Sequence, residues 1–324
     1  MLPIEIVVAA APSDGRGHSA RALALAEACG ALGLEARIVF LRGRPTYRQR
    51  SAAVRLGVAV AEGLPDGDGV VVLDLPDPNE GLRFAPPSRL AVFDDREWLR
   101  GEAALVIQPS LPAWDGGERA RADVVLAGYA FAPVGAGVRG RRPREVSPGT
   151  SDAPMVLVCF GGSDPEDVSG RLGAPITAVA ERVGAFVDVV VGPDYAGDLA
   201  ARGGVVAVVR DPPDLLDRLV AADVVVIGAG TMKFEVACLG RPMLLTAVVD
   251  DQLAVGPPFA ATGAAVWLGD GRNIDPEGAA EEVGRVLGAA DTRLELARRA
   301  HALVDGEGAR RIGDALAELA AASG

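Results

Sequence analysis

Residues 4–32 read IEIVVAAAPSDGRGHSARALALAEACGAL, and this stretch decides the class of fold that we expect for the chain. It opens with the apolar run Ile4–Val8, in which β-branched residues predominate, as is typical of a strand buried on both faces. A glycine-rich turn follows, and then an Ala- and Leu-rich segment that predicts a helix as far as Leu32. This order of strand, glycine-rich turn and helix indicates a doubly wound α/β domain.

The same alternation of strands and helices continues along the rest of the chain. Further strands are predicted at Glu35–Leu41, Val70–Leu73, Arg89–Phe93, Ala104–Ile107 and Asp123–Leu126, and then at Met155–Phe160, Ala185–Val191, Val205–Arg210, Asp223–Ile227, Met243–Ala247 and Ala264–Leu268. Near-continuous apolar runs joined by helices predict parallel strands with right-handed crossovers. We therefore expect an α/β protein with two Rossmann-like, doubly wound domains.

A stretch rich in Gly, Pro, Ser and Arg separates the two series of strands and is interpreted as a linker, with its arginines on a solvated face. We place the first domain at residues 1–135, the linker at 136–153 and the second domain at 154–324. The last segment, Glu307–Ala321, has apolar residues at helical spacing. This helix could close the second domain or cross back onto the first.

Composition and charge exclude several classes of protein. Of the 324 residues, 49% are hydrophobic and 23% are charged, which excludes a disordered chain. The 44 acidic and 32 basic residues leave a net charge of −12, so no nucleic-acid partner is expected and any phosphate must be bound locally. Cys29, Cys159 and Cys238 lie far apart and only two histidines are present, so neither a metal site nor a disulfide framework is expected.

Membrane insertion is not expected either. No run of about 18 apolar residues occurs that could span a bilayer. The apolar start Ile4–Ala11 contains Glu5 and has no basic region before it, unlike a signal peptide. We predict a cytoplasmic protein, and leave peripheral membrane contact and the oligomeric state open.

The first candidate catalytic residue is His18, in the glycine-rich turn after the first strand. Gly15 and Gly17 let the backbone approach a ligand closely, at the edge of a parallel sheet where ligands bind. A neutral imidazole can accept a proton from water near pH 7, so His18 is interpreted as a general base. A capping or core histidine is the alternative.

Two later strands end in carboxylates, Asp74 in one and Asp94 with Asp95 in the next. The carboxyl ends of parallel strands meet at one edge of a sheet, where carboxylates can orient a sugar hydroxyl, position water or fix a histidine. The alternative is that each aspartate caps the turn that follows its strand.

A phosphate site is predicted at Gly228-Ala229-Gly230-Thr231, again between a strand and a helix. Its backbone N–H groups, the Thr231 hydroxyl and Lys233, the only lysine of the chain, could together hold a diphosphate. Lys233 could equally be a solvated helix residue. Glu235 follows one helical turn later and could accept both ribose hydroxyls of a nucleotide; the alternative is a surface acid that the helix dipole favours.

A second glycine-rich loop, Gly161-Gly162-Ser163, is expected to pack closely against the nucleotide. Asp164 and Pro165 follow it as a typical N-cap and first helical residue. The acids that crowd this first turn would repel a pyrophosphate, so we do not expect the main phosphate contact here.

These motifs together resemble the PseG/SpsG-type nucleotide-sugar hydrolases, which are relatives of the MurG-like glycosyltransferases. The matching residues are Gly15-x-Gly17-His18-x-x-Arg21, Asp74, Phe93-Asp94-Asp95, Leu126-Ala-Gly-Tyr129, Phe160-Gly-Gly-Ser-Asp-Pro165, Gly228-Ala-Gly-Thr231 with Glu235, Gly240-x-Pro242 and Gln252. They run in the family's order over most of the chain.

The resemblance implies a GT-B fold, with two Rossmann-like domains facing across a cleft. The nucleotide would bind to the second domain and the sugar would face the first, where the family's histidine is the catalytic base. Hydrolysis of a UDP-linked 2,4-diacetamido-2,4,6-trideoxyhexose to free sugar and UDP, without a metal, is the family's best-known activity. The resemblance also implies catalytic roles for His18 and Asp74, a ribose contact for Glu235, and substrate contacts for Gly17, Arg21, Asp95, Tyr129, Asp251 and Gln252.

Two departures from the family concern the sugar. The hydrolases usually have a tyrosine two residues after the aspartate, where this chain has Asp74-Leu75-Pro76. They usually have Asn-Gln where this chain has Asp251-Gln252. The nucleotide half of the resemblance is unaffected by these changes.

From these observations we expect a metal-independent nucleotide-sugar hydrolase without a cofactor, acting on a small-molecule UDP-sugar. The alternative is a GT-B glycosyltransferase that uses the same nucleotide-sugar site with a hydroxyl acceptor. A local basic cluster at Arg42, Arg44, Arg48 and Arg50 keeps that alternative open. A second alternative is a nucleotide-sugar-binding protein without turnover.

Overall fold

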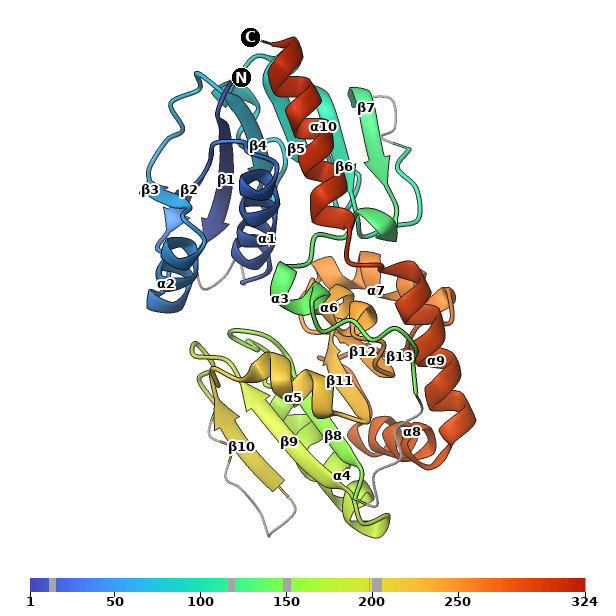
Figure 1. Cartoon of the computed structure of the whole chain (residues 1–324). Helices are drawn as coiled ribbons and strands as arrows, with labels where there is room; N and C mark the ends of the chain where they lie inside the picture. The colour runs from blue at the N-terminus through green and yellow to red at the C-terminus, as the bar shows by residue number, and fades with distance from the viewer. Residues whose placement is uncertain (12–15, 116–119, 148–152, 198, 200–205, 324) are drawn as a thin grey trace. The chain divides into compact units, whose positions relative to one another are not determined.

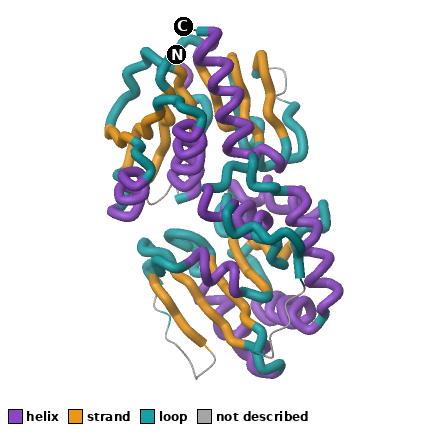
Figure 2. The backbone as a smooth tube through the Cα atoms, in the orientation of Figure 1, coloured by secondary structure: helices purple, strands orange, loops and turns teal. Residues whose placement is uncertain are grey.

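The computed structural model describes residues 1–11, 16–115, 120–147, 153–197, 199 and 206–323. The chain forms two compact units, one of Met1–Arg139 with Val304–Gly324 and one of Gly140–Leu303 (Figure 1). The last helix, α10 (Gly308–Ala322), therefore belongs to the first unit, which is one of the two alternatives that the sequence leaves open for it, and not to a second domain of residues 154–324. Each unit is a parallel sheet with helices laid against it (Figure 2).

The first unit is built on a seven-stranded parallel sheet in the order β3-β2-β1-β4-β5-β6-β7. The strands are β1 (Ile4–Ala10), β2 (Ala36–Gly43), β3 (Ala59–Glu62), β4 (Val70–Asp74), β5 (Leu90–Phe93), β6 (Glu102–Gln108) and β7 (Arg121–Ala127). Every strand expected in this half is present. The additional strand, β3, is short and lies at the sheet edge, where a continuous apolar run is not required.

Helices cover one face of this sheet. They are α1 (Gly17–Ala31), α2 (Tyr47–Arg55) and α10, and α1 packs against β1, β2 and α10. Ile312 and Leu316 of α10 are fully buried in the same core as Leu25 of α1 and Ile6 of β1. This burial of apolar side chains holds the end of the chain against its beginning.

The other face of the first sheet differs from the expected alternation of strands and helices. The described connections from β4 to β7 contain the short 3₁₀ turns η2 (Leu82–Phe84) and η3 (Pro87–Arg89) but no α-helix. Proline lacks a backbone N–H and disfavours helical conformation in the residue before it. These connections carry Pro76, Pro78, Pro86, Pro87, Pro109 and Pro112.

The second unit has a six-stranded parallel sheet in the order β10-β9-β8-β11-β12-β13. Its strands are β8 (Met155–Cys159), β9 (Phe186–Val191), β10 (Val206–Arg210), β11 (Val224–Gly228), β12 (Met243–Ala247) and β13 (Val266–Asp270). Its helices are α4 (Val168–Arg182), α5 (Leu215–Ala221), α6 (Met232–Cys238), α7 (Asp251–Ala261), α8 (Pro276–Gly288) and α9 (Ala290–Leu303). Every strand expected in this half is present.

The segment between the sheets is not a free linker. It contains the 3₁₀ turn η5 (Tyr129–Phe131) and the short helix α3 (Ala136–Arg139). Arg142 donates hydrogen bonds to the backbone oxygens of Cys238, at 3.2 Å, and His301, at 2.9 Å, so this arginine is not on a solvated face. Part of the expected linker, residues 148–152, lies outside the described residues.

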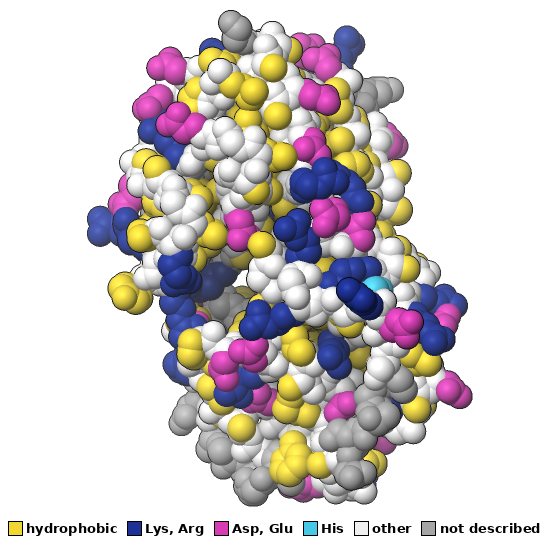
Figure 3. Space-filling view, in the orientation of Figure 1, with side chains coloured by type: hydrophobic (Ala, Val, Ile, Leu, Met, Phe, Trp, Pro, Cys, Tyr) yellow, Lys and Arg dark blue, Asp and Glu magenta, His cyan; other side chains and the backbone are white. Residues whose placement is uncertain are grey.

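Figure 3 shows the distribution of charged side chains on one face of the molecule. On the face shown in Figure 3, acidic and basic side chains lie interspersed among uncharged ones. Among the described residues, no helix is long and apolar enough to cross a bilayer.

Candidate functional site

The first sheet has its topological switch point between β1 and β4, because the chain continues from β1 to β2 on one side and later returns as β4 on the other. Ligands of open α/β sheets bind beyond the carboxyl ends of the strands at such a point. His18 lies in the first turn of α1, directly after β1, and Asp74 is the last residue of β4. The fold therefore brings together two residues that are far apart in sequence.

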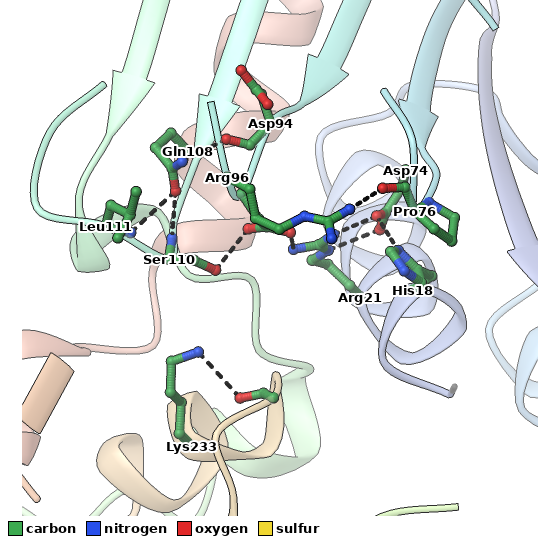
Figure 4. A network of polar contacts seen from close by, with 12 residues as sticks. His18, Arg21, Asp74, Pro76, Asp94, Arg96, Gln108, Ser110, Leu111 and Lys233 are labelled. Atoms are coloured by element: carbon green, nitrogen blue, oxygen red, sulfur yellow. Dashed lines mark hydrogen bonds and ion pairs between the residues drawn. The ribbon is translucent and has the colours of Figure 1, made fainter. Parts of the chain in front are cut away.

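His18 and Asp74 form a hydrogen-bonded pair. The Nδ1 atom of His18 lies 2.6 Å from Oδ1 of Asp74 (Figure 4). Asp74 is fully buried, whereas 18% of the His18 side chain remains exposed. Burial alone would raise the pKa of Asp74, but the charges and hydrogen bonds of Arg21 and His18 outweigh it and hold this pKa well below its usual value.

The ionised Asp74 determines which nitrogen of His18 carries the proton. A carboxylate only accepts hydrogen bonds, so Nδ1 of His18 must be the donor in this pair. In the neutral imidazole the other nitrogen, Nε2, then has its lone pair free to accept a proton. The geometry is thus that of a general base oriented by a carboxylate.

Arg21 binds the carboxylates of Asp74 and Asp95. The expectation that it contacts substrate is therefore corrected. Its Nε donates to Oδ2 of Asp74 at 2.8 Å, its Nη2 donates to Oδ1 of Asp74, and its Nη1 donates to Oδ2 of Asp95 at 2.7 Å. The guanidinium also lies 4.3 Å from the centre of the Phe93 ring. Only 2% of the side chain is exposed, so its donors face protein carboxylates rather than a ligand.

The carboxylates after β5 divide into two roles. Asp94 is buried and accepts hydrogen bonds from the Trp98 amide at 2.7 Å and the Trp114 indole at 2.8 Å, which confirms the alternative that it caps its own loop. Asp95 is partly exposed; one oxygen is bound to Arg21 and the other accepts from the Ser110 hydroxyl at 2.6 Å.

Sequence reasoning missed two buried polar residues at the same edge, Gln108 and Ser110. The Gln108 side chain accepts from the Ser110 amide at 2.9 Å and from the Leu111 amide at 3.1 Å, and donates to the Asp94 backbone oxygen. The available signal was their position at and just after the carboxyl end of an apolar strand. Arg96, also missed, donates to the Pro76 oxygen (Figure 4).

Three other expectations concern this unit. Tyr129 is 6% exposed, and burial raises the pKa of its phenol to about 12, so the expected substrate contact is corrected to a core position in η5. Leu75, the residue after Asp74, is also buried. Gly17 begins α1, and Gly15 lies outside the described residues.

The second sheet has its switch point between β8 and β11, with the two glycine-rich loops at adjoining strand ends. The side chain of Gln252 lies against the loop 228–231: a Cβ atom at Gly228 would come within 3.2 Å of its Oε1, and one at Gly230 within 3.4 Å of its Nε2. Its Oε1 accepts from the Val248 amide at 2.9 Å. Two predicted nucleotide-site elements, the loop and Gln252, are thus in contact.

Within this loop, two expected phosphate contacts are corrected. The Ala229 amide donates to the Thr246 oxygen at 2.9 Å and Ala229 is fully buried, so this N–H is not available to a ligand. Lys233 is neither a phosphate contact nor a solvated residue, because it is buried and its ammonium donates to two carbonyls of the loop. The amides of Gly230 and Thr231 find no acceptor among the described residues.

Glu235 is partly buried one turn into α6. Among the described residues, none forms a hydrogen bond or ion pair with its carboxylate, and burial raises its pKa from 4.5 to about 7. A carboxylate that is partly buried and unpaired is costly unless a ligand supplies donors. Such donors are what a pair of ribose hydroxyls offers.

The loop 161–163 approaches the end of β9. Gly161 has a φ of +90°, and a Cβ at Gly192 would come within 2.1 Å of the Gly162 oxygen, so both positions require glycine. Asp164 accepts from the amides of Val168 at 3.0 Å and Ser169 at 2.8 Å.

The helix start after this loop differs from the expected one. Helix α4 begins at Val168, and its N-cap is Asp167, which accepts from the Gly170 amide at 3.1 Å. The predicted N-cap Asp164 lies one turn earlier with a φ of 41°, from where it still bonds the first helical amides.

Two other expected site residues are accessible: Ser163 is partly exposed, and Asp251 is exposed at the first position of α7. In the described part of the chain, no cluster of three or more His, Cys, Asp or Glu side chains is arranged to hold a metal ion.

The sequence was compared with those of known proteins. No protein-family model matches the chain. The spore coat polysaccharide biosynthesis protein SpsG of Bacillus subtilis (strain 168) is 27% identical over 173 residues, which are 52% of this chain and 51% of that protein. The chain thus matches about half the length of this curated relative, and over that half the resemblance to SpsG is confirmed.

Solved structures are similar over nearly the whole chain. MurG of Acinetobacter baumannii is 15% identical with a TM-score of 0.60, covering 98% of this chain and 99% of that chain. The spinosyn rhamnosyltransferase SpnG, complexed with thymidine diphosphate, is 17% identical with a TM-score of 0.62, covering 97% and 100%. MnaA of S. aureus, in a structure with UDP, is 11% identical with a TM-score of 0.64, covering 96% and 95%. These likenesses confirm the GT-B fold.

Proposed function

We propose that the chain is a metal-independent nucleotide-sugar hydrolase, acting on a UDP-sugar and releasing free sugar and UDP. The observation that carries the proposal is the pair of His18 and the buried, ionised Asp74 at the switch point of the first sheet. Support also comes from the likeness to SpsG and from solved structures of the same fold that hold UDP or thymidine diphosphate.

In the proposed reaction, water attacks the anomeric carbon of the sugar and the bond from that carbon to the diphosphate oxygen breaks. Nε2 of His18 takes a proton from the water, and Asp74 stabilises the imidazolium that forms, through the hydrogen bond at Nδ1. UDP leaves with the electron pair of the broken bond. Arg21 does not touch the reacting atoms, but it keeps Asp74 ionised and in place.

The nucleotide is proposed to bind at the switch point of the second sheet. The Gly230 and Thr231 amides would donate to the diphosphate, and Glu235 would accept from the ribose hydroxyls. Gly161, Gly162 and Ser163 would line the neighbouring strand end.

Product analysis in ¹⁸O-labelled water tests the proposal. The protein is incubated with a panel of UDP-, GDP- and CMP-sugars in EDTA. Attack at carbon leaves the released UDP unlabelled, whereas attack at phosphorus puts the label into a phosphate. His18→Asn and Asp74→Asn are compared with the wild type. The proposal is supported if the wild type releases free sugar and unlabelled UDP and the two variants do not. Release of UMP with sugar 1-phosphate, or turnover that needs a divalent cation, contradicts it.

The glycosyltransferase alternative is favoured by one observation, the likeness to SpnG and MurG. In that case His18 would take its proton from an acceptor hydroxyl instead of water. Adding sugar acceptors to the same panel distinguishes the two, because a transferase releases UDP only with an acceptor present. UDP-sugar binding without turnover under either condition would leave the non-catalytic alternative.

A further inference from the structure

Lys233 is the only lysine of the chain, and the proposed reaction gives it no part. Its side chain is 1% exposed, although Thr231, two residues before it, is partly exposed. The ammonium donates to the backbone oxygen of Ala229 at 3.0 Å and to that of Gly230 at 3.2 Å (Figure 4 shows Lys233 with such a contact). Two consecutive carbonyls of the glycine-rich loop are therefore turned toward one buried cation.

Peptide geometry extends this observation to the amides of the loop. In a trans peptide unit, the C=O of one residue and the N–H of the next point in opposite directions. With the carbonyls of Ala229 and Gly230 facing the ammonium, the N–H groups of Gly230 and Thr231 must point away from it. These are the two amides that find no acceptor among the described residues, and both belong to partly exposed residues.

Aromatic rings hold the ammonium in this position. It lies 4.3 Å from the centre of the Phe234 ring and 6.0 Å from that of Phe259, and the two rings meet edge to face. Cation–π attraction and the two carbonyl contacts offset part of the cost of burying the charge. The lysine is thus anchored beneath the loop.

We propose that Lys233 is a positioning residue: it holds the Gly230 and Thr231 amides in the orientation that binds the diphosphate, without itself touching it. This inference rests on the proposed nucleotide site. Adjacent amides that point to one side form the kind of concave surface that binds anions. The buried charge also adds a positive potential behind these peptide dipoles.

Binding measurements with Lys233→Met test the proposal, because methionine keeps the apolar stem and removes the ammonium. Calorimetry with UDP, inorganic pyrophosphate and uridine should show about tenfold or greater weakening for UDP and pyrophosphate, as two amides lose their fixed direction, and no change for uridine. Val236→Ala is the matched control, since it removes buried packing from the same helix and leaves Lys233 with both carbonyls and both aromatic rings. It should lower stability and weaken all three ligands equally or none.

A single lysine also gives a direct spectroscopic readout in the wild type. In protein labelled with ¹³C-lysine, the Cε–Hε signal should carry a ring-current shift from Phe234, because the ammonium lies 4.3 Å from the centre of that ring, and saturating pyrophosphate should leave the shift in place. Its loss would mean that the ammonium leaves the rings to bind the anion, which overturns the positioning role even if Lys233→Met does not fold. Equal pyrophosphate affinity for Lys233→Met and wild type also overturns it. A wild type that binds neither UDP nor pyrophosphate refutes the nucleotide site itself.

Discussion

Glu235→Gln should remove a large pH dependence from the stability of the protein. The pKa of this carboxyl rises from 4.5 to about 7 on folding, because burial disfavours the charged form. One pKa unit corresponds to about 1.4 kcal/mol, so ionising Glu235 in the folded state costs up to about 3 kcal/mol. The amide of glutamine is similar in size and has no charge to bury.

The direction of this pH dependence of stability follows from proton linkage. Between pH 4.5 and about 7 the folded state binds more protons at Glu235 than the unfolded state does, so this group's contribution to stability falls as the pH rises. The contribution is fully present below pH 4.5 and is lost above about pH 7. Relative to Glu235→Gln, the wild type should therefore lose up to about 3 kcal/mol across this window.

Urea unfolding of both proteins at a series of pH values measures this difference. Titrations of all other groups are common to the two proteins and cancel in the comparison. Glu277→Gln, which removes an exposed carboxyl from the first turn of α8, controls for the loss of one charge. A stability difference between wild type and Glu235→Gln that does not vary with pH would refute the assignment of a partly buried, unpaired carboxyl.

The same titration should appear in ligand binding. If ionised Glu235 accepts from the ribose hydroxyls, affinity for UDP-N-acetylglucosamine should weaken by up to about tenfold per pH unit below about 7. This ligand is chosen because its diphosphate is a diester that does not titrate in that range. Binding to Glu235→Gln should be weaker and independent of pH; parallel pH profiles for the two proteins would remove the ribose assignment.

Further predictions concern the first sheet and the sugar. His18→Asn should lower kcat by about 10²-fold or more with the Kd for UDP unchanged, and a variant that retains most of its kcat would show that His18 is not the base. Arg21→Met should destabilise the fold by about 3–5 kcal/mol in urea unfolding, because it leaves buried Asp74 short of a partner. Arg42→Met, at a partly exposed arginine that pairs with Glu80, should cost under about 1 kcal/mol, and equal losses for the two variants would contradict this account. A carboxylate such as that of Asp251 cannot donate hydrogen bonds, so a substrate panel should show higher kcat/KM for a sugar with fewer acetamido groups than the 2,4-diacetamido trideoxyhexose. Asp251→Asn should reduce this difference in kcat/KM between the two sugars. A clear preference of the wild type for the diacetamido sugar would refute the prediction.

Local patterns were sufficient to predict the strands, the glycine-rich turns and the class of fold. A strand buried on both faces requires a continuous apolar run, and a turn that approaches a ligand requires glycine, so both features are visible in a few consecutive residues. The short edge strand β3 and the helix-free connections from β4 to β7 are the exceptions. The strand β3 depends on its position at the edge of the sheet. The connections from β4 to β7 contain prolines, which prevent a helix but do not determine which conformation is adopted instead.

The partners of each site residue were decided only by the tertiary structure. Sequence placed three aspartates at strand ends, but the strand order makes Asp74, 56 residues from His18, its partner and leaves Asp94 to cap a loop. Arg21 and Lys233 are residue types that commonly bind anionic ligands, yet both side chains point into the protein. Arg21 donates to carboxylates and Lys233 donates to backbone carbonyls. The reason is physical: a long cationic side chain can reach either solvent or the interior, and which it takes depends on acceptors that the fold brings from distant parts of the chain.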